Sequence, residues 1–291
     1  MRAPAVSVVV PTRNRAGYLE VALGSLNAQE GAGESEVIVV DDGSSDATRT
    51  VARRAGARHV PLPPPGGLNA ARNLGARESR APLVAFVDDD VWAPPGWLRA
   101  VAAGAARHPA TDAFGGPIRA RLEGPAPRAC GREKPPITTL DLGPEDVDAA
   151  MVWGANFAIR REALDRYGPF DERLAGHGDE EEWLMALRAA GGQIVYLAGA
   201  GLDHRRTGED SRLRSLAGAA YRKGRAARRT DARRGVAPSA ARELRDVAGA
   251  GWHTIRRTCP LGIVMGAHST GRLAEALRSP VTESGAAARR P

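Results

Sequence analysis

The chain has 291 residues, of which 43% are hydrophobic and 26% are charged, a composition typical of a soluble globular protein with a sizeable core. The formal net charge of +7 suggests an anionic partner, but nearly all of the basic residues are arginine, a bias that residue usage alone can produce, so we expect no nucleic acid binding. The sequence contains no run of membrane-spanning length and no signal-peptide pattern at its start, which predicts a cytoplasmic protein.

The N-terminal part of the sequence predicts alternating strands and helices. Short apolar runs predict buried strands, at 6–10, 36–40, 59–62 and 83–87. Helices are expected after the first two of these strands, at 68–79, and in a segment that buries Trp97. Repeated strand–helix alternation predicts a parallel, doubly wound sheet whose strand ends gather at one edge.

The strand at 83–87 ends abruptly in three consecutive carboxylates, Asp88, Asp89 and Asp90. Open α/β sheets bind ligands at the carboxyl ends of their strands, and three adjacent acids repel one another unless a positive charge lies among them. A hard divalent cation is therefore the simplest explanation. For the triplet taken alone, a solvated acidic turn is the alternative. Thr12 and Asp42 also follow strands and should converge on the same edge.

Beyond residue 115 the pattern is less regular. Residues 115–150 are rich in Gly, Pro and charge and predict an irregular excursion. The segment 151–160 reads as a strand and 161–167 as a short helix. A further helix should begin in the acidic block Asp179–Glu182, because acids complement a helix N-terminus. Another strand is expected at 194–197, followed shortly by Asp203-His204.

Seven segments of this sequence, in order and spacing, resemble the family-2 glycosyltransferases, which have the GT-A fold. They are SVVVPTRNR, VIVVDDGSSD, GLNAARNLGA, VAFVDDDV, GANFAIRREALDRYGPFDERL, GDEEEWL and DHR, and together they cover about residues 5–206. The expected fold is thus α/β: a GT-A, Rossmann-like, doubly wound and mostly parallel sheet. We expect a nucleotide-sugar-binding and catalytic domain at 1–206 and a basic, mostly helical C-terminal extension at 207–291.

The resemblance implies that a sugar, a hexosyl or N-acetylhexosaminyl group, is moved from a nucleoside diphosphate donor to an unidentified acceptor with inversion. A carboxylate facing the base ring accepts from an imide N–H, which favours a UDP-sugar, with a dTDP-sugar as the other possibility. The implied cofactor is Mn²⁺ or Mg²⁺, which neutralises the leaving diphosphate. The alternatives are a sugar-phosphate nucleotidyltransferase and a non-catalytic nucleotide-sugar-binding protein. The segment PTRNR lacks the glycine-rich loop usual in the former.

The resemblance also implies the donor-binding residues, which are Pro11, Thr12, Arg13, Asp42, Arg72, Asp88, Asp89 and Gly154. In particular, the loop 11–13 would offer backbone groups to the base, Arg72 would meet the ribose–diphosphate region, and 154–156 would line the sugar pocket.

The same resemblance assigns the metal to Asp90 and His204 and the general base to the acidic block. For His204 an ordinary capping or core role is the alternative. Glu180 is the expected base and Asp179 the second choice. The competing interpretation is that these acids only complement the helix dipole.

The remaining features lie mainly in the extension. Tyr221–Arg234 carries seven basic residues and one acid, which could contact the donor diphosphate, an anionic carrier or a membrane surface, or form a solvated helix face. The predicted location is therefore the cytoplasm, with peripheral contact at the inner face of the membrane as a further possibility. Residues 240–278 are expected to be helical and partly amphipathic. Cys130 and Cys259 are far apart, match no metal-binding spacing and fit a reducing compartment.

Overall fold

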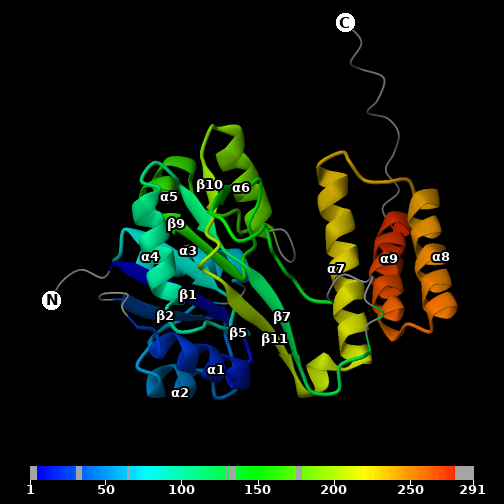
Figure 1. Cartoon of the computed structure of the whole chain (residues 1–291), viewed down its shortest axis with the longest axis horizontal. Helices are drawn as coiled ribbons and strands as arrows, with labels where there is room; N and C mark the ends of the chain where they lie inside the picture. Colours follow the sequence, from blue (N-terminus) through cyan, green and yellow to red (C-terminus); the bar gives the residue numbers. More distant parts are fainter. Residues whose placement is uncertain are drawn as a thin grey trace, which may run out of the picture. The chain divides into compact units, whose positions relative to one another are not determined.

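The structure is a computed structural model that describes residues 5–30, 35–63, 66–128, 130, 136–174 and 179–278 (Figure 1). The chain divides into two compact units. The first contains residues up to Arg121, Ile137–Ala175 and Asp179–Arg205. The second contains Leu122–Pro136, Gly176–Gly178 and the chain from Arg206 onward.

The first unit is built on an eight-stranded sheet with the order β3-β2-β1-β4-β9-β6-β10-β8. The four adjacent strands β3, β2, β1 and β4 run parallel to one another, and β10 is parallel to β6. Strand β9 runs antiparallel between β4 and β6, and β8 is antiparallel to β10. The strands are β1 Val6–Thr12, β2 Ser35–Asp41, β3 Arg58–Pro61, β4 Leu83–Val87, β6 Ala113–Gly115, β8 Val147–Asp148, β9 Asn156–Arg160 and β10 Ile194–Tyr196. The predicted α/β fold with a large, mostly parallel sheet is confirmed.

Helices cover both faces of this sheet (Figure 1). One core joins the sheet to α1, α2 and α4, and the other joins it to α3, α5 and α6. The alternation of strand side chains explains the two cores, since Val8 belongs to the first and its neighbour Val9 to the second. The helices are α1 Ala16–Asn27, α2 Thr48–Arg54, α3 Leu68–Glu78, α4 Trp97–Arg107, α5 Arg161–Tyr167 and α6 Asp179–Ala189.

The structure contains a second sheet of three strands, ordered β5-β11-β7, which was not predicted from the sequence. Its strands are β5 Val91–Trp92, β7 Ile118–Glu123 and β11 Leu202–Thr207. The supposedly irregular segment after residue 115 thus opens with a strand, which its charged residues hid from a search for apolar runs. Arg119 of β7, for instance, donates from Nε to Asp203 Oδ1 of β11 at 2.7 Å. His204 lies inside β11, opposite Val91, rather than after a strand.

The strand expected at 151–160 is also shorter than predicted, because β9 begins at Asn156. The Asn156 N–H donates to the Trp153 carbonyl at 2.9 Å, a turn that places the preceding residues outside the sheet. The following helix has the predicted bounds, Arg161–Tyr167.

In its described part, the second unit contains three helices, α7 Leu213–Arg233, α8 Ala240–Arg257 and α9 Pro260–Arg278, after a short 3₁₀ turn at Gly208–Ser211. Helix α9 packs against both of the others. Its crossing with α7 is close, since a Cβ at Gly224 would lie 2.0 Å from the His268 carbonyl oxygen and one at Gly271 would lie 2.1 Å from that of Tyr221. The predicted helical extension is therefore present.

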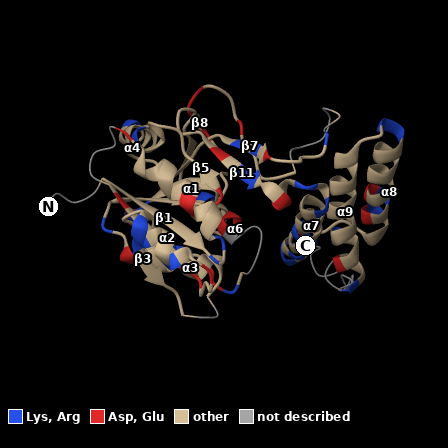
Figure 2. Cartoon of the chain, turned by 90° about the horizontal axis from the view of Figure 1, so that it is seen from below, with Lys and Arg blue, Asp and Glu red and all other residues tan. Residues whose placement is uncertain are grey.

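Charges of both signs occur within this helical unit (Figure 2). Glu243, fully buried, accepts from Arg272 at 2.8 Å, and Arg228 lies 3.5 Å from it. Arg225 and Arg229 both bond to Glu275, at 2.7 and 3.1 Å. Several arginines of the basic segment thus pair inside the unit. Among the helices described, none is both long and apolar enough to cross a membrane.

Candidate functional site

The acidic triplet begins where β4 ends, at the carboxyl edge of the first unit's sheet. Its middle member turns toward the protein: Asp89 Oδ2 accepts from Thr12 Oγ1 at 2.7 Å and Oδ1 pairs with Arg15 Nη1 at 2.8 Å. Burial raises the pKa of Asp89 to about 7, against the opposing charge of Arg15. Both carboxylate oxygens have protein partners, so Asp89 fixes the turn and the first strand end together.

Arg15 joins the two buried carboxylates of this turn. Its Nη2 donates to Asp90 Oδ2 at 2.8 Å, while Nη1 pairs with Asp89, and the guanidinium stacks on Tyr18 at 4.3 Å from the ring centre. Burial alone would lower the pKa of Arg15, but the charges of Asp90 and Asp89 raise it on balance. Arg15 was not among the site residues predicted from the sequence. It is the last residue of the segment SVVVPTRNR, but its pairing with the acidic turn depends on tertiary structure.

The outer two members of the triplet meet His204. One oxygen of Asp88, one of Asp90 and a ring nitrogen of His204 all lie within 4.8 Å of one another. Asp90 and His204 are buried, at 2% and 4% exposure, and His204 Nε2 lies 3.1 Å from Asp90 Oδ1. Burial, together with the charge of Asp90, raises the pKa of Asp88. The structure therefore brings together the two predicted metal ligands and adds Asp88 to them.

The orientation of His204 indicates that a cation fits this group. Its Nδ1 lies 3.2 Å from the Thr138 carbonyl oxygen, which can only accept, so Nδ1 carries the proton. In the neutral ring, Nε2 then presents a lone pair toward the Asp90 carboxylate. His204 Nε2 and Asp90 Oδ1 are then two acceptors 3.1 Å apart, and such a pair requires either a proton or a cation between them. Two carboxylates and an imidazole held by a backbone carbonyl form an ordinary donor set for a divalent metal.

Asp42 directly follows β2, which is separated from β4 by β1, and one of its carboxylate oxygens is satisfied. Its Oδ2 accepts from the Gly67 N–H at 3.2 Å and lies 3.5 Å from Arg13 Nη1. Its Oδ1 is buried and, among the described residues, has no hydrogen-bond partner. An orphaned buried oxygen of this kind suits an incoming N–H donor.

The segment 11–13 differs from the expected loop. Pro11 and Thr12 belong to β1, and the Thr12 carbonyl already accepts from the Asp42 N–H at 3.0 Å. Arg13 follows the strand with a largely exposed side chain.

Arg72 and Glu180 meet beside Gly154. Arg72 Nη1 lies 3.3 Å from Glu180 Oε2, and the Gly154 N–H donates to Glu180 Oε1 at 2.9 Å. Burial alone would raise the pKa of Glu180, but Arg72 and the Gly154 hydrogen bond lower it below its ordinary value. A Cβ at Gly154 would lie 2.2 Å from Arg72 Nη2. The lack of a side chain at Gly154 thus leaves space for the Arg72–Glu180 ion pair. The family resemblance had predicted that this glycine would lie beside the donor sugar.

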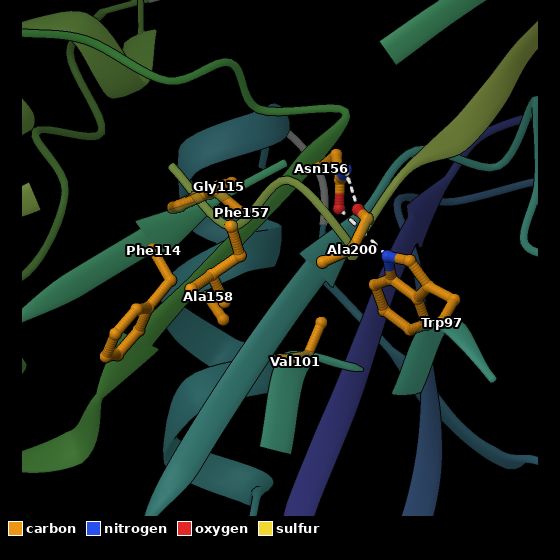
Figure 3. Close-up of a pocket in the computed structure, with 9 residues that line it drawn as sticks. Trp97, Val101, Phe114, Gly115, Asn156, Phe157, Ala158 and Ala200 are labelled. Atoms are coloured by element: carbon orange, nitrogen blue, oxygen red, sulfur yellow. Dashed lines mark hydrogen bonds between the residues drawn. The ribbon is translucent and has the colours of Figure 1, made fainter. Parts of the chain in front are cut away.

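Asn156, expected in the sugar pocket, links parts of the protein instead (Figure 3). Its Oδ1 accepts from Trp97 Nε1 at 3.1 Å, and its Nδ2 donates to the carbonyls of Pro117 and Ala200 at 3.1 and 2.8 Å. The adjoining cavity measures about 10 Å³ and has a mostly apolar lining, which includes Phe114 and Phe157. It holds one water at most and no sugar. Asp179 opens α6, but its side chain lies outside the described residues.

Comparison with known proteins agrees with this architecture. Residues 7–168, more than half of the chain, match the model of glycosyl transferase family 2. The fold also superposes on a mannosyltransferase from Pyrobaculum calidifontis, with a TM-score of 0.59 and 19% identity over 97% of this chain and 73% of the other. Residues 1–349 of S. aureus TarS superpose with a TM-score of 0.55 and 18% identity, over 94% of this chain and 91% of that one. The fold is GT-A, as predicted, and the chain belongs to glycosyl transferase family 2.

The curated relatives named here are matched over part of their length. Validoxylamine A glucosyltransferase from Streptomyces hygroscopicus subsp. jinggangensis is 33% identical over 209 residues, which cover 61% of this chain and 50% of the relative. The pre-mycofactocin glycosyltransferase of Mycobacterium tuberculosis is 30% identical over 69% of this chain and 43% of its own length. The chain thus spans about half the length of these relatives.

Proposed function

We propose that this protein is a metal-dependent glycosyltransferase that moves a sugar from a nucleoside diphosphate donor to an acceptor, with inversion at the anomeric carbon. The observation that carries the proposal is the group formed by Asp88, Asp90 and His204 at the carboxyl end of β4 in a chain of this family. The relatives named above are themselves described as glycosyltransferases.

The proposed metal site consists of Asp90 and His204, with Asp88 beside them. A divalent cation held there would neutralise the charge that develops on the leaving diphosphate, so no protein acid need protonate it. The imidazole favours Mn²⁺ over Mg²⁺, which prefers an all-oxygen shell. The structure of the P. calidifontis mannosyltransferase is described as a complex with GDP-Man and Mn²⁺.

We propose Asp42 as the residue that recognises the base. Its buried Oδ1 can accept the imide N–H of uracil or thymine, which supports a UDP-sugar, or a dTDP-sugar, as donor. The TarS structure described above contains UDP-GlcNAc. Thr12 and Asp89 would hold the strand ends that shape this part of the site, through their mutual hydrogen bond.

Glu180 is the proposed general base. Its lowered pKa keeps it ionised at neutral pH, as a proton acceptor must be, and Arg72 and Gly154 hold it in place. Asp179 remains the second choice. Arg72, whose cation faces this carboxylate, is proposed to contact the donor diphosphate as well.

Donor hydrolysis tests the proposal without the acceptor. With Mn²⁺ present, we expect slow release of UDP from a UDP-sugar in a panel that also contains dTDP- and GDP-sugars. Asp90→Asn should abolish this release and weaken metal-dependent UDP binding in calorimetry, whereas Asp165→Asn, at an exposed position on α5, should change neither. Pyrophosphate release from UTP and a sugar phosphate would support the nucleotidyltransferase alternative. Activity of Asp90→Asn within a few fold of the parent would overturn the metal assignment.

The cytoplasmic location and the peripheral membrane contact of the basic segment also stay proposals. Sedimentation with anionic liposomes tests the second, since an electrostatic contact with lipid weakens as salt is added.

A further inference from the structure

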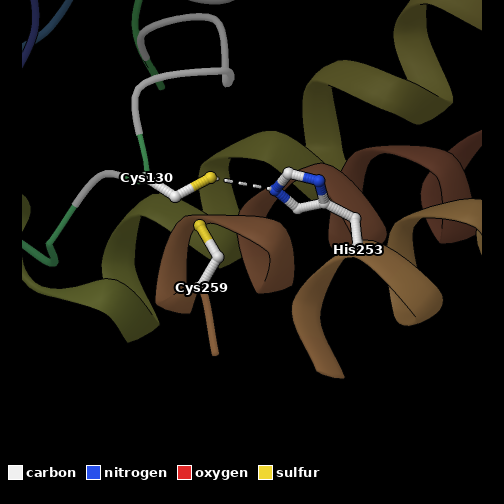
Figure 4. A group of neighbouring side chains, drawn as sticks. All are labelled: Cys130, His253 and Cys259. Atoms are coloured by element: carbon white, nitrogen blue, oxygen red, sulfur yellow. Dashed lines mark hydrogen bonds between the residues drawn. The ribbon is translucent and has the colours of Figure 1, made fainter. Parts of the chain in front are cut away.

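A second group of metal-type ligands lies in the helical unit (Figure 4). Cys130 follows β7, His253 belongs to the last turns of α8, and Cys259 directly precedes α9. Their two sulfur atoms and one ring nitrogen all lie within 4.8 Å of one another. Cys130 Sγ is 3.4 Å from His253 Nε2, and Cys259 is 2% exposed. The sequence spacing predicted no such group, because Cys130 and His253 are 123 positions apart in the chain.

Local backbone geometry brings two of the three ligands together. Thr258 ends α8 with a left-handed backbone, φ 47°, and the Cys259 N–H then donates to the Thr254 carbonyl at 3.1 Å. This sharp reversal places Cys259 beside the final turns of α8, where His253 lies. Gly262 lets the start of α9 pack closely against the end of α8, since a Cβ there would lie 2.3 Å from Thr254 Oγ1 and 3.1 Å from His253 Cδ2. A non-glycine residue with positive φ is uncommon and is held by its surroundings.

The separations suit a tetrahedral metal. With Zn–S near 2.3 Å and Zn–N near 2.0–2.1 Å, tetrahedral S and N ligand atoms lie about 3.5–3.8 Å apart. The Cys130–His253 separation of 3.4 Å is close to this. A disulfide instead needs its sulfurs at about 2.05 Å, and neither cysteine forms a disulfide among the described residues.

We propose that Cys130, His253 and Cys259 form a site for a thiophilic divalent metal of the Zn²⁺ class, with a solvent molecule completing the coordination. Two thiolates and an imidazole select a softer metal than the carboxylate-rich group of the first unit. A metal here would join the segment after β7 to the turn between α8 and α9. Its role would be structural, since it would hold three segments of the helical unit together.

Metal content and cobalt spectroscopy of the full chain test this proposal. Purified without chelators, the protein should contain about one Zn²⁺ per chain, because metal bound at a site that links segments of the fold is retained with the folded protein. Exchange for Co²⁺ should give the sulfur-to-cobalt charge-transfer absorption and the intense visible bands of tetrahedral thiolate ligation. Cys130→Ser and His253→Asn should each weaken or remove these bands. Both side chains are only partly buried, so these variants are the ones expected to fold.

Matched controls separate this site from the first unit's acidic group. His268→Asn changes another histidine of the helical unit, and Asp90→Asn changes the carboxylate group, and both should keep the zinc and the cobalt bands. Loss of zinc should lower the melting temperature of the parent and leave that of Cys130→Ser unchanged. Cobalt bands without thiolate character, or zinc retained in Cys130→Ser, would overturn the proposal. So would a Cys130–Cys259 disulfide found by mass spectrometry in protein kept under reducing conditions.

Discussion

Arg72 and Glu180 form an ion pair in which the arginine is 2% exposed and the glutamate side chain 13% exposed, with Nη1 and Oε2 separated by 3.3 Å. The guanidinium also lies 5.5 Å from the ring centre of Phe157. A buried cation of this kind depends on its carboxylate partner. The proposed base therefore also has a structural role, and any substitution of Glu180 must be interpreted with both in mind.

Glu180→Gln should lower turnover by roughly 10²–10⁴, because the amide cannot take a proton. It should also destabilise the fold, by up to about 3–5 kcal/mol, since Arg72 would be left buried beside a neutral group. Steady-state kinetics and urea unfolding of the same preparation measure the two effects. If stability falls while turnover does not, Glu180 only positions Arg72. Asp179→Asn is the control. A larger loss of turnover in that variant would assign the role of general base to Asp179.

The regular elements of the first unit could be predicted from sequence because their signals are local. Strand β4 has the predicted bounds, Leu83–Val87, since a run of apolar residues ending in acids is visible in any window. Helix α5 begins and ends where expected for the same reason. Strand β7 was missed because its charged residues are satisfied by a partner strand more than eighty positions away.

The site was predictable only in part, for a related reason. The family resemblance predicted that Asp90 and His204 would serve one metal site, and in the structure their side chains lie together. The bonds of Arg15 to the acidic turn, and the meeting of Cys130 with His253, depend on contacts between distant segments. No periodicity or spacing in the sequence reports such contacts, so geometry was needed to find them.

The pH dependence of stability should report the Arg72–Glu180 pair. The pKa of Glu180 is lowered in the folded protein from an ordinary value of 4.5. A lowered carboxyl pKa adds stability that is fully present above the unfolded value and is lost as pH falls through the folded one. The difference in unfolding free energy between the parent and Glu180→Gln should thus be constant at pH 6–8 and shrink below about pH 4.5. A difference that grew on acidification would contradict this assignment.

Gly154→Ala should disturb the same pair from the backbone side. The new Cβ would lie 2.2 Å from Arg72 Nη2 and 3.0 Å from Glu180 Cδ, so both side chains must move. We expect a loss of turnover of at least about tenfold, because small displacements of catalytic groups are costly. Gly24→Ala is the matched control, since nothing lies within 4 Å of a Cβ there, and it should be neutral or slightly stabilising.

Asp42 should determine the choice of base. Uridine presents an N3–H donor to the buried Oδ1, whereas cytidine presents an acceptor at the same ring position, so UDP should bind more tightly than CDP by about tenfold. Asp42→Asn can offer an N–H instead and should narrow this difference. Calorimetric titration of both nucleotides into both proteins measures it. An unchanged UDP-to-CDP ratio in the variant would assign base recognition elsewhere, and preferential binding of GDP would overturn the uracil preference.

Three arginines in the basic segment of α7 stabilise the helical unit, so the effect of substituting them on stability must be measured before any effect on acceptor binding. Arg225 and Arg229 bond to Glu275, and Arg228 donates to the Pro238 carbonyl and approaches Glu243. Neutralising these three arginines together should therefore lower the melting temperature, because the largely buried Glu275 would lose both of its cations. Glu243 would keep its bond to Arg272 and lose only the approach of Arg228.

Arg222, which is exposed on the same helix, separates the structural role of the segment from a surface role. Arg222→Gln should leave the melting temperature unchanged. If the segment attracts an anionic acceptor or carrier, this variant should raise the Michaelis constant for that molecule by a few fold, and the effect should fade with added salt because such attraction is screened within about 8–10 Å. Unchanged kinetics and no sedimentation with anionic liposomes would assign the exposed arginines to solvation alone.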